Sequence, residues 1–453
     1  MTLAIALILL VIGTVLFHFL SPWWFTPIAS NWTMVDETVN VTFWVTGIVF
    51  VLVNLFMAYA IIRYRHRKGS GQKAHYEPEN RKLEWGLTIV TSVGIAAMLA
   101  PGLAVWAKFV TVPPEASVVE VLGQQWNWNY RFPGADGALG KTEARLINVD
   151  NPFGMNPDDP AGADDILVGT PELHLPINKP VKMELRSIDV NHQYAVPQFR
   201  VKMDLVAGMV TYFWLTPTRT GAFDALCEQL CGTAHFAMRG RVVVDEQEKF
   251  DTWLAAQPTF ASTRAATAGD PAAGQALFAT CTACHGAQAE GNRDLNAPKL
   301  AGQASWYLVQ QLKYFRQGVR GTHEQDVYGK QMAPFATLLP DDAAIRNVVA
   351  YITSLPETRP AATVLGNPDK GQSLYATTCA ICHGHQGQGI WATNAPRLSG
   401  MSDWYMQRQL NNFRQDIRGS HPQDFRGSQM ASMARVLKDD QAIADLLDYV
   451  HTL

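Results

Sequence analysis

Three long apolar runs fill the first 110 residues of this 453-residue chain, at residues 3–20, 41–62 and 85–107. A helix rises about 1.5 Å per residue and the hydrocarbon core of a bilayer is about 30 Å thick, so the second and third runs are long enough to cross it. Within lipid, every backbone polar group must be satisfied inside the segment, and a helix does this for a single run. We therefore predict a transmembrane region over residues 1–110, with helices near the three runs.

The charges beside these runs predict their orientation. Acidic residues precede the second run (Asp36, Glu37), and basic residues cluster between the second and third (Arg63, Arg65, Arg67, Lys68, Lys73, Arg81, Lys82). Basic loops stay on the cytoplasmic side, so we expect residues 63–84 in the cytoplasm and everything after Lys108 on the periplasmic side of a bacterial inner membrane. The first run is either a third span or a cleaved signal peptide. The lack of basic residues after Met1 favours a span.

Length and composition limit the number of domains and the kinds of partner that the chain can have. A length of 453 residues predicts three or four folding units. The 37 basic and 40 acidic residues nearly cancel, which argues against a nucleic-acid partner. We expect domains at 111–257, 268–356 and 366–453, with an Ala-, Thr- and Pro-rich flexible linker at 258–270.

The first of these domains is rich in short β-like segments. They lie near 118–122, 181–185, 209–215 and 241–244, between glycines and prolines, which is typical of a sandwich or barrel. The loop at 156–165 is Asp- and Gly-rich but lacks the spacing of a calcium loop, so we expect a solvated turn.

All six cysteines fall into three close pairs, which is unlike a disulfide framework that joins distant segments. In the first pair, His and Met follow the second Cys at four and seven residues, and His192 lies upstream; the set is Cys227, Cys231, His235 and Met238 with His192. Two thiolates, two imidazoles and a thioether suit copper. A disulfide does not explain the His and Met, and Met is a poor zinc ligand.

The other two pairs lie in an internal duplication. Cys281-Thr-Ala-Cys284-His285 recurs as Cys379-Ala-Ile-Cys382-His383, and from the first Cys onward the copies align without a gap, 98 residues apart. Cys-x-x-Cys-His is the attachment signature of c-type haem. Amphipathic segments at 305–317 and 341–354, with counterparts at 403–415 and 439–451, predict two small helical domains.

A methionine follows each attachment motif by about 50 residues, in a Gly-x-Gln-Met-Ala context. Met332 and Met430 are therefore the predicted axial partners of His285 and His383, and His/Met ligation suits electron transfer. Met433 is a rival to Met430, and the aligned His323 and His421 are alternatives for both.

The copper motif, together with Asp189-Val-Asn-His192 and Gln125-Trp126-Asn-Trp128-Asn-Tyr130, resembles the CuA domain of cytochrome c oxidase subunit II, and the repeats resemble cytochrome c domains. The resemblance implies a multidomain protein: N-terminal transmembrane helices, a cupredoxin-like β-sandwich and two all-α cytochrome c domains. It implies that Cys227 and Cys231 bridge two coppers, that His192 and His235 cap them, and that Met238 and the carbonyl of Gln229 bind weakly.

The resemblance also suggests roles that the residues leave open. Trp126 stands where the family passes an external donor's electron to copper, although it also reads as a core aromatic. Glu84 stands at a proton entrance to subunit I, although a carboxylate is favoured at any helix N-terminus. Gln229 replaces a Glu that helps the family bind magnesium, so a magnesium contact stays open.

The implied function is that of subunit II of a proton-translocating terminal oxidase. Electrons would pass from a soluble or membrane-bound cytochrome c-type donor through two haems c and CuA to subunit I, with subunit III and lipid as further partners. Alternatives are the small subunit of a CuA-containing nitric oxide reductase and a membrane-anchored electron carrier without a catalytic partner. The sequence leaves open the order of the two haems, the donor and the partner subunit.

Overall fold

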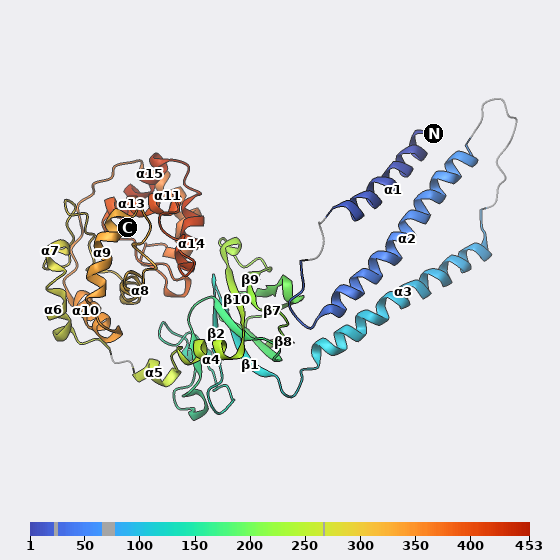
Figure 1. Ribbon diagram of the computed structural model, residues 1–453. Coiled ribbons are helices and arrows are strands. Elements are labelled where there is room, and N and C mark those ends of the chain that lie inside the picture. The colour runs from blue at the N-terminus through green and yellow to red at the C-terminus, as the bar shows by residue number, and fades with distance from the viewer. Residues whose placement is uncertain (22–25, 66–77, 266–267) are drawn as a thin grey trace.

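The computed structural model describes residues 1–21, 26–65, 78–265 and 268–453, and it shows a helical hairpin region, a β-sandwich and a pair of helical domains in chain order (Figure 1). The helices are α1 (Thr2–Leu20), α2 (Thr33–Arg63), α3 (Arg81–Val110), α4 (Gln247–Ala255), α5 (Phe260–Ala265), α6 (Pro271–Phe278), α7 (Thr282–His285), α8 (Ser305–Arg316), α9 (Val327–Thr337), α10 (Asp342–Ser354), α11 (Pro368–Leu374), α12 (Ala380–His383), α13 (Asp403–Arg414), α14 (Phe425–Ala434) and α15 (Asp440–Thr452). The strands are β1 (Ser117–Gln124), β2 (Asn127–Phe132), β3 (Ile166–Val168), β4 (Glu172–Pro176), β5 (Val181–Ser187), β6 (His192–Val196), β7 (Val201–Leu205), β8 (Thr211–Leu215), β9 (Gly221–Cys227) and β10 (Arg239–Asp245).

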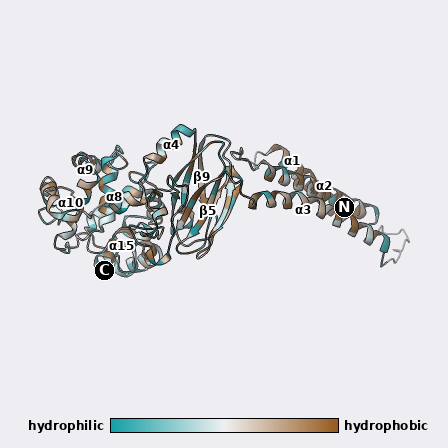
Figure 2. Cartoon of the chain, turned by 90° about the horizontal axis from the view of Figure 1, so that it is seen from below, coloured by the Kyte–Doolittle hydropathy of each residue, from teal (hydrophilic) through white to brown (hydrophobic). Residues whose placement is uncertain are grey.

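Helices α1, α2 and α3 are each long and apolar enough to cross a membrane, and much of their length is brown, the colour of hydrophobic residues, in Figure 2. Helix α2 begins eight residues before the predicted run at residue 41, because the polar residues of its first two turns continue the helix beyond the apolar segment. Asn80 caps α3, where its side chain accepts a hydrogen bond from the Leu83 amide at 3.1 Å. Arg67, Lys68 and Lys73 of the predicted cytoplasmic loop lie outside the described residues.

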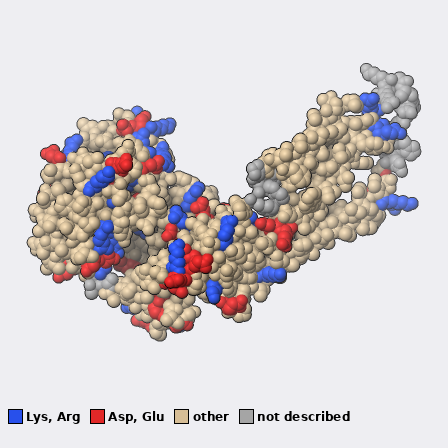
Figure 3. Space-filling model, in the orientation of Figure 1, with Lys and Arg blue, Asp and Glu red and all other residues tan. Residues whose placement is uncertain are grey.

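The β-sandwich is fixed to one end of the α2–α3 hairpin. The Trp32 indole donates to the Trp214 carbonyl at 2.9 Å, and the Trp214 indole donates to the Lys108 carbonyl at 3.0 Å. Arg200 pairs with Asp36 in the first turn of α2 at 2.6 Å. Lys and Arg side chains gather at the opposite end of the hairpin, whose shaft is almost free of charge (Figure 3). The described basic residues at this end, Arg63, Arg65, Arg81 and Lys82, are therefore separated from the folded domains by the length of the helices.

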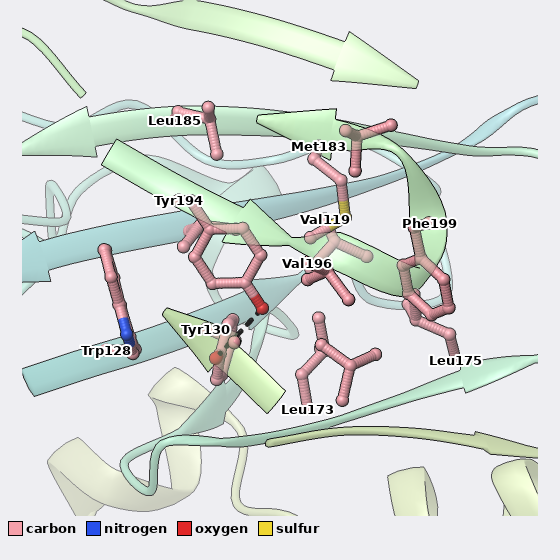
Figure 4. Close-up of a cluster of buried hydrophobic side chains, with 14 of the residues drawn as sticks. Val119, Trp128, Tyr130, Leu173, Leu175, Met183, Leu185, Tyr194, Val196 and Phe199 are labelled. Carbon is pink, nitrogen blue, oxygen red and sulfur yellow. Dashed lines mark hydrogen bonds between the residues drawn. The ribbon is translucent and has the colours of Figure 1, made fainter. Parts of the chain in front are cut away.

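Two five-stranded sheets form the sandwich, with strand orders β3-β2-β1-β5-β8 and β4-β10-β9-β6-β7. Aromatic and branched side chains from both sheets meet in one buried core, where the hydroxyls of Tyr130 and Tyr194 are 3.3 Å apart (Figure 4). The predicted strand segments are confirmed, except that β8 begins at Thr211, after the exposed Met209 and Val210. Strands β5 and β10 alternate buried and less buried residues, as expected for two sheets packed face to face, whereas β2 is buried along its whole length.

Two expectations about loops were wrong. The stretch predicted as a flexible linker contains helix α5, whose Phe260 is 3% exposed and packs with Leu122 and Met155 of the sandwich. The loop at 156–165 is not a solvated turn throughout, because Asp165 is fully buried and accepts a hydrogen bond from Arg131 at 2.7 Å. Both segments gain partners that are distant in the sequence.

The two helical domains repeat one architecture. In the first, α6 crosses α10 at Gly274, where a Cβ atom would lie 1.9 Å from the Asn347 carbonyl oxygen; in the second, α11 crosses α15 at Gly371, with the Asp445 oxygen at 2.0 Å. A glycine is required at each crossing because the backbones are too close for any side chain. The second copy has one more residue between this glycine and its first attachment cysteine, and a π-helical turn at Tyr375–Cys379 absorbs it.

Asp403 fastens the segment between the helical domains to the start of α13. Its buried carboxylate accepts hydrogen bonds from both the amide and the hydroxyl of Thr363, from the Val364 amide and from the Trp404 amide. Burial by itself would raise the pKa of Asp403, but these hydrogen bonds outweigh it and lower the pKa below its usual value.

The pKa of Asp403 is lower in the folded state than in the unfolded state. Its carboxylate therefore stabilises the fold at pH values above the unfolded-state pKa, and this stabilisation is lost as the pH falls through the folded-state pKa. We expect Asp403→Asn to cost about 1–3 kcal/mol near neutral pH and to flatten the loss of stability below about pH 4. Thermal melting followed by haem absorbance from pH 3 to 7 measures this, with the exposed Asp440→Asn as the control. Equal pH profiles for the two variants would contradict it.

Candidate copper centre and haem-attachment sites

The predicted copper ligands come from the loop between β9 and β10 and from the start of β6. Strand β9 ends at Cys227, a 3-10 turn begins at His235, and β10 begins directly after Met238. The loop is closed at its base by a hydrogen bond from the Cys227 amide to the Met238 carbonyl at 3.2 Å. His192 is brought alongside because β6 pairs with β9, with Tyr194 opposite Cys227.

These side chains converge on the two thiols. The Cys227 and Cys231 sulfurs are 3.6 Å apart. His192 Nδ1 lies 3.9 Å from the first sulfur and His235 Nδ1 lies 3.4 Å from the second. Met238 Sδ is 3.8 Å from the Cys231 sulfur, and the Gln229 carbonyl oxygen is 3.2 Å from the Cys227 sulfur. All six sequence-predicted copper ligands therefore surround one point.

The electrostatics of this cluster favour one anionic sulfur within the pair of thiols. The hydrogen bond between the two thiols is the largest influence on both: it lowers the pKa of Cys227, with His192 acting in the same direction, and raises the pKa of Cys231. Burial alone would lower the pKa of His192, but its hydrogen bonds with Asp189 and Cys227 raise it. Asp189 accepts from His192 Nε2 at 2.8 Å, which turns Nδ1 toward the thiols. A buried set of sulfur and imidazole donors fits a soft metal such as copper.

Trp126 and Glu84 lie in different surroundings. Trp126 is 3% exposed, and its indole donates to the Cys231 carbonyl at 3.2 Å, so it contacts the copper loop directly. Glu84 is exposed in the first turn of α3, and its carboxylate accepts from the Asn80 amide at 3.3 Å. That contact is a helix cap, and it leaves the second carboxylate oxygen available.

Each haem-attachment motif ends in a buried histidine, and one ring nitrogen of that histidine is hydrogen-bonded to a backbone carbonyl. His285 Nδ1 is 2.8 Å from the Pro298 carbonyl oxygen, and His383 Nδ1 is 2.7 Å from that of Pro396. The carbonyl must accept, so Nδ1 carries the proton and Nε2 has a free lone pair. Burial lowers the pKa of both histidines, which keeps the rings neutral. A neutral imidazole held in this way fits haem iron.

One continuous cavity contains both attachment motifs. Its lining includes the two cysteine pairs, both motif histidines and the three candidate methionines: Cys281, Cys284, His285, Met332, Cys379, Cys382, His383, Met430 and Met433. Among the described residues, His323 and His421 do not line it, and they border a separate small pocket instead. The geometry thus favours methionine over these histidines, while Met430 and Met433 both face the cavity.

The two helical domains hold each other through a duplicated contact that sequence reasoning missed. Arg320 of the first domain donates to the Tyr405 hydroxyl at 2.8 Å, and Arg418 of the second donates to the Tyr307 hydroxyl at 2.9 Å. Both arginines and both tyrosines are 98 residues apart, so the contact has an approximate two-fold symmetry. The repeated Arg-Gly pairs after each Phe-Arg were the signal that could have revealed it.

Comparison with known proteins assigns these regions. The family description "Cytochrome C oxidase subunit II, periplasmic domain" matches residues 117–246, and "Cytochrome c" matches residues 271–356 and 368–453. The "Alternative cytochrome c oxidase subunit 2" of Bradyrhizobium diazoefficiens is 56% identical over 261 residues, which are 58% of this chain and 94% of that protein. The chain belongs to the cytochrome c oxidase subunit II family.

Two further relatives match different parts of the chain. The "Cytochrome c oxidase subunit 2" of Cereibacter sphaeroides is 31% identical over 51% of this chain and 77% of its own length. The "Cytochrome c4" of Azotobacter vinelandii is 34% identical over 41% of this chain and 90% of its own length. The predicted fold class is confirmed: apolar N-terminal helices, a cupredoxin-like sandwich and all-α cytochrome c domains.

Membership of the family fixes the broad role. This subunit II is a membrane-anchored component of a haem-copper oxidase, associates with subunit I and has an oxidoreductase role. The subunit II domain implies CuA-type copper, and the cytochrome c domains imply haem c.

The choice between Met430 and Met433 can be tested spectroscopically. We expect Met430→Ala to abolish the charge-transfer absorption of methionine sulfur with ferric iron at one of two haems, because Met430 aligns with Met332. Met332→Ala should abolish it at the other haem, and Met433→Ala should leave both signals. Loss of the signal in Met433→Ala but not in Met430→Ala would reverse the assignment.

Proposed function

We propose that this chain relays single electrons from an external cytochrome c-type donor to the oxygen-reducing subunit I, through two covalently attached haems c and a dinuclear CuA centre. The observation that supports it most strongly is the contact between the candidate sites. Gln429, next to Met430, donates to the Trp126 carbonyl, and the Trp126 indole donates to the carbonyl of the candidate copper ligand Cys231.

In this proposal the residues of the chain have defined tasks. The copper ligands are His192, Cys227, Gln229 through its carbonyl, Cys231, His235 and Met238; the haem residues are Cys281, Cys284, His285, Met332, Cys379, Cys382, His383 and Met430. Copper and haem each change oxidation state by one electron when bound. The protein holds the donors rigidly, excludes water around the buried sulfurs and fixes the histidine tautomers, so that little rearrangement accompanies a change of charge.

We also propose where the chain lies and what it contacts. Helices α1–α3 cross the bacterial inner membrane, with the basic loop in the cytoplasm and the copper and haem domains in the periplasm. Lipid surrounds the exposed apolar faces of these helices, and subunit III accompanies subunit I. The relatives from Bradyrhizobium diazoefficiens and Cereibacter sphaeroides are cytochrome c oxidase subunits, which favours oxygen over nitric oxide as the substrate of the complex.

Purification in mild detergent tests the relay. We expect the chain to emerge with a larger haem-bearing subunit, two coppers and two covalent haems c per chain, and oxygen consumption driven by a reduced c-type cytochrome. Cys227→Ser should remove copper but leave both haems attached, whereas Cys281→Ser should leave copper in place. A chain that emerges alone would favour a carrier, and turnover of nitric oxide but not oxygen would favour a reductase. Absence of copper would overturn the assignment.

Proton translocation is a further part of the proposal, with Glu84 at the proton entrance. We expect Glu84→Gln to lower oxygen turnover and proton release by reconstituted vesicles several-fold, because an amide does not exchange protons. The nearby exposed Glu79→Gln is the matched control and should behave as the unaltered protein. A Glu84→Gln enzyme with unchanged proton release would show that this carboxylate is only a helix cap.

A further inference from the structure

The second cytochrome c domain is docked on the copper domain, and the contact is made by one particular face. Gln124 of β1 donates to the Ala392 carbonyl at 2.7 Å. Gln429 of α14 donates to the carbonyls of Trp126 and, at 3.3 Å, Ala237. Cys382 and Met433 pack against the same buried cluster that includes Cys227 and Cys231. This docked face therefore covers Trp126 and carries no ion pair in these contacts.

The duplication identifies the equivalent face of the first cytochrome c domain. With the 98-residue offset, Ala392, Gln429 and Met433 correspond to Asp294, Gln331 and Phe335. In the first copy these three positions are exposed, whereas in the second they are half-buried. Helix α14 lies next to the copper domain, and its counterpart α9 lies farther from it in Figure 1.

The uncovered face is unusually apolar for a protein surface. Four large apolar side chains stand on it beside the amide of Gln331: Val327 and Leu338, with exposed fractions of 55% and 60%, and Leu295 and Phe335, which line the cavity of the first haem-attachment site. We call these five residues the outer face. Val327, Gln331, Phe335 and Leu338 follow one another at helical spacing along α9 and just beyond its end. Leu295, Gln331 and Phe335 also line the cavity that contains His285 and Met332.

We infer that the outer face is the docking surface for the external electron donor, a c-type cytochrome whose own contact surface is largely apolar. The inference rests on the proposed function. In the second cytochrome c domain, the equivalent face already contacts the copper domain of the same chain, through apolar side chains and side-chain amides. In the other copy, Gln331 and Phe335 are the counterparts of the docked Gln429 and Met433 and lie beside the other haem-attachment site, and an exposed apolar cluster of this kind marks an interaction site.

The assignment also orders the relay. A donor cannot reach Trp126, because this side chain is 3% exposed beneath the second cytochrome c domain. The first domain is the outer acceptor, and the second domain is the one in contact with the copper loop. The five residues of the outer face are uncharged, and Asp294, beside Leu295, is the one charged side chain among the positions equivalent to the docked contacts, so donor binding should depend only weakly on salt.

Aligned variants of the full-length protein in its complex provide the test. Leu338→Glu places a charge on the outer face, and Val436→Glu places the same charge at the equivalent position of the second copy, where Val436 is 51% exposed. The probe is a soluble monohaem c-type cytochrome, and its affinity for the immobilised oxidised complex is measured by surface plasmon resonance. We expect Leu338→Glu to weaken binding by about tenfold or more and Val436→Glu by less than about twofold.

A second variant and a small-molecule reductant make each outcome decisive. Phe335→Ser should weaken binding in the same way, with haem spectra unchanged. A small-molecule reductant should still reduce the haems and copper in every variant, and failure of this step would count against the proposed function and not against the docking surface. Equal losses in Leu338→Glu and Val436→Glu, no loss in either, loss in Val436→Glu alone, or binding that collapses with added salt would overturn the inference.

Discussion

Two buried thiols must be held 3.6 Å apart, with imidazole and thioether donors beside them, inside an apolar core. Such a cluster is unfavourable unless the surrounding backbone fixes it, because unpaired sulfur anions and polar rings lose their hydration there. The antiparallel pair β9 and β10 provides this restraint, since its ladder runs up to both ends of the ligand loop. Strand β6 adds His192 from a neighbouring position in the same sheet. The sandwich is thus the frame that makes the copper chemistry possible.

The rest of the chain is arranged around that frame. On one side, Trp32, Trp214 and the Arg200–Asp36 pair fix the sandwich to the ends of α2 and α3. On another side, Gln124 and Gln429 hold the second cytochrome c domain over Trp126. Apart from the Arg200–Asp36 ion pair, these contacts are hydrogen bonds from amide and indole groups to backbone carbonyls, which fix geometry without requiring a change of protonation. A membrane anchor and a redox domain are therefore both placed relative to one copper loop.

The duplicated domains show how one sequence pattern acquires two roles. Within the pair, Arg320 with Tyr405 and Arg418 with Tyr307 make nearly the same contact twice, so each copy contributes one arginine and one tyrosine to the interface. Their outer surroundings differ, because among the described residues the hydrogen bonds and buried contacts noted above between the helical pair and the copper domain come from the second copy. The same face is therefore an internal interface in one copy and a free apolar surface in the other. This asymmetry distinguishes an outer copy from a copy that contacts the copper domain, which the repeat alone does not do.

Local patterns in the sequence determined the three apolar helices, the β-rich character of the middle segment, the motif of Cys, His and Met between Cys227 and Met238, and the paired haem-attachment motifs, because each depends on residues close together in the sequence. Tertiary structure alone decided that Phe260 belongs to the sandwich, that Asp165 is buried, that Trp126 lies beneath the second cytochrome c domain and that Leu338 stays exposed. Those outcomes depend on contacts between segments separated by up to about three hundred residues, as with Gln429 and Trp126. No periodicity or spacing encodes such contacts, since their free energy arises only when complete domains pack together.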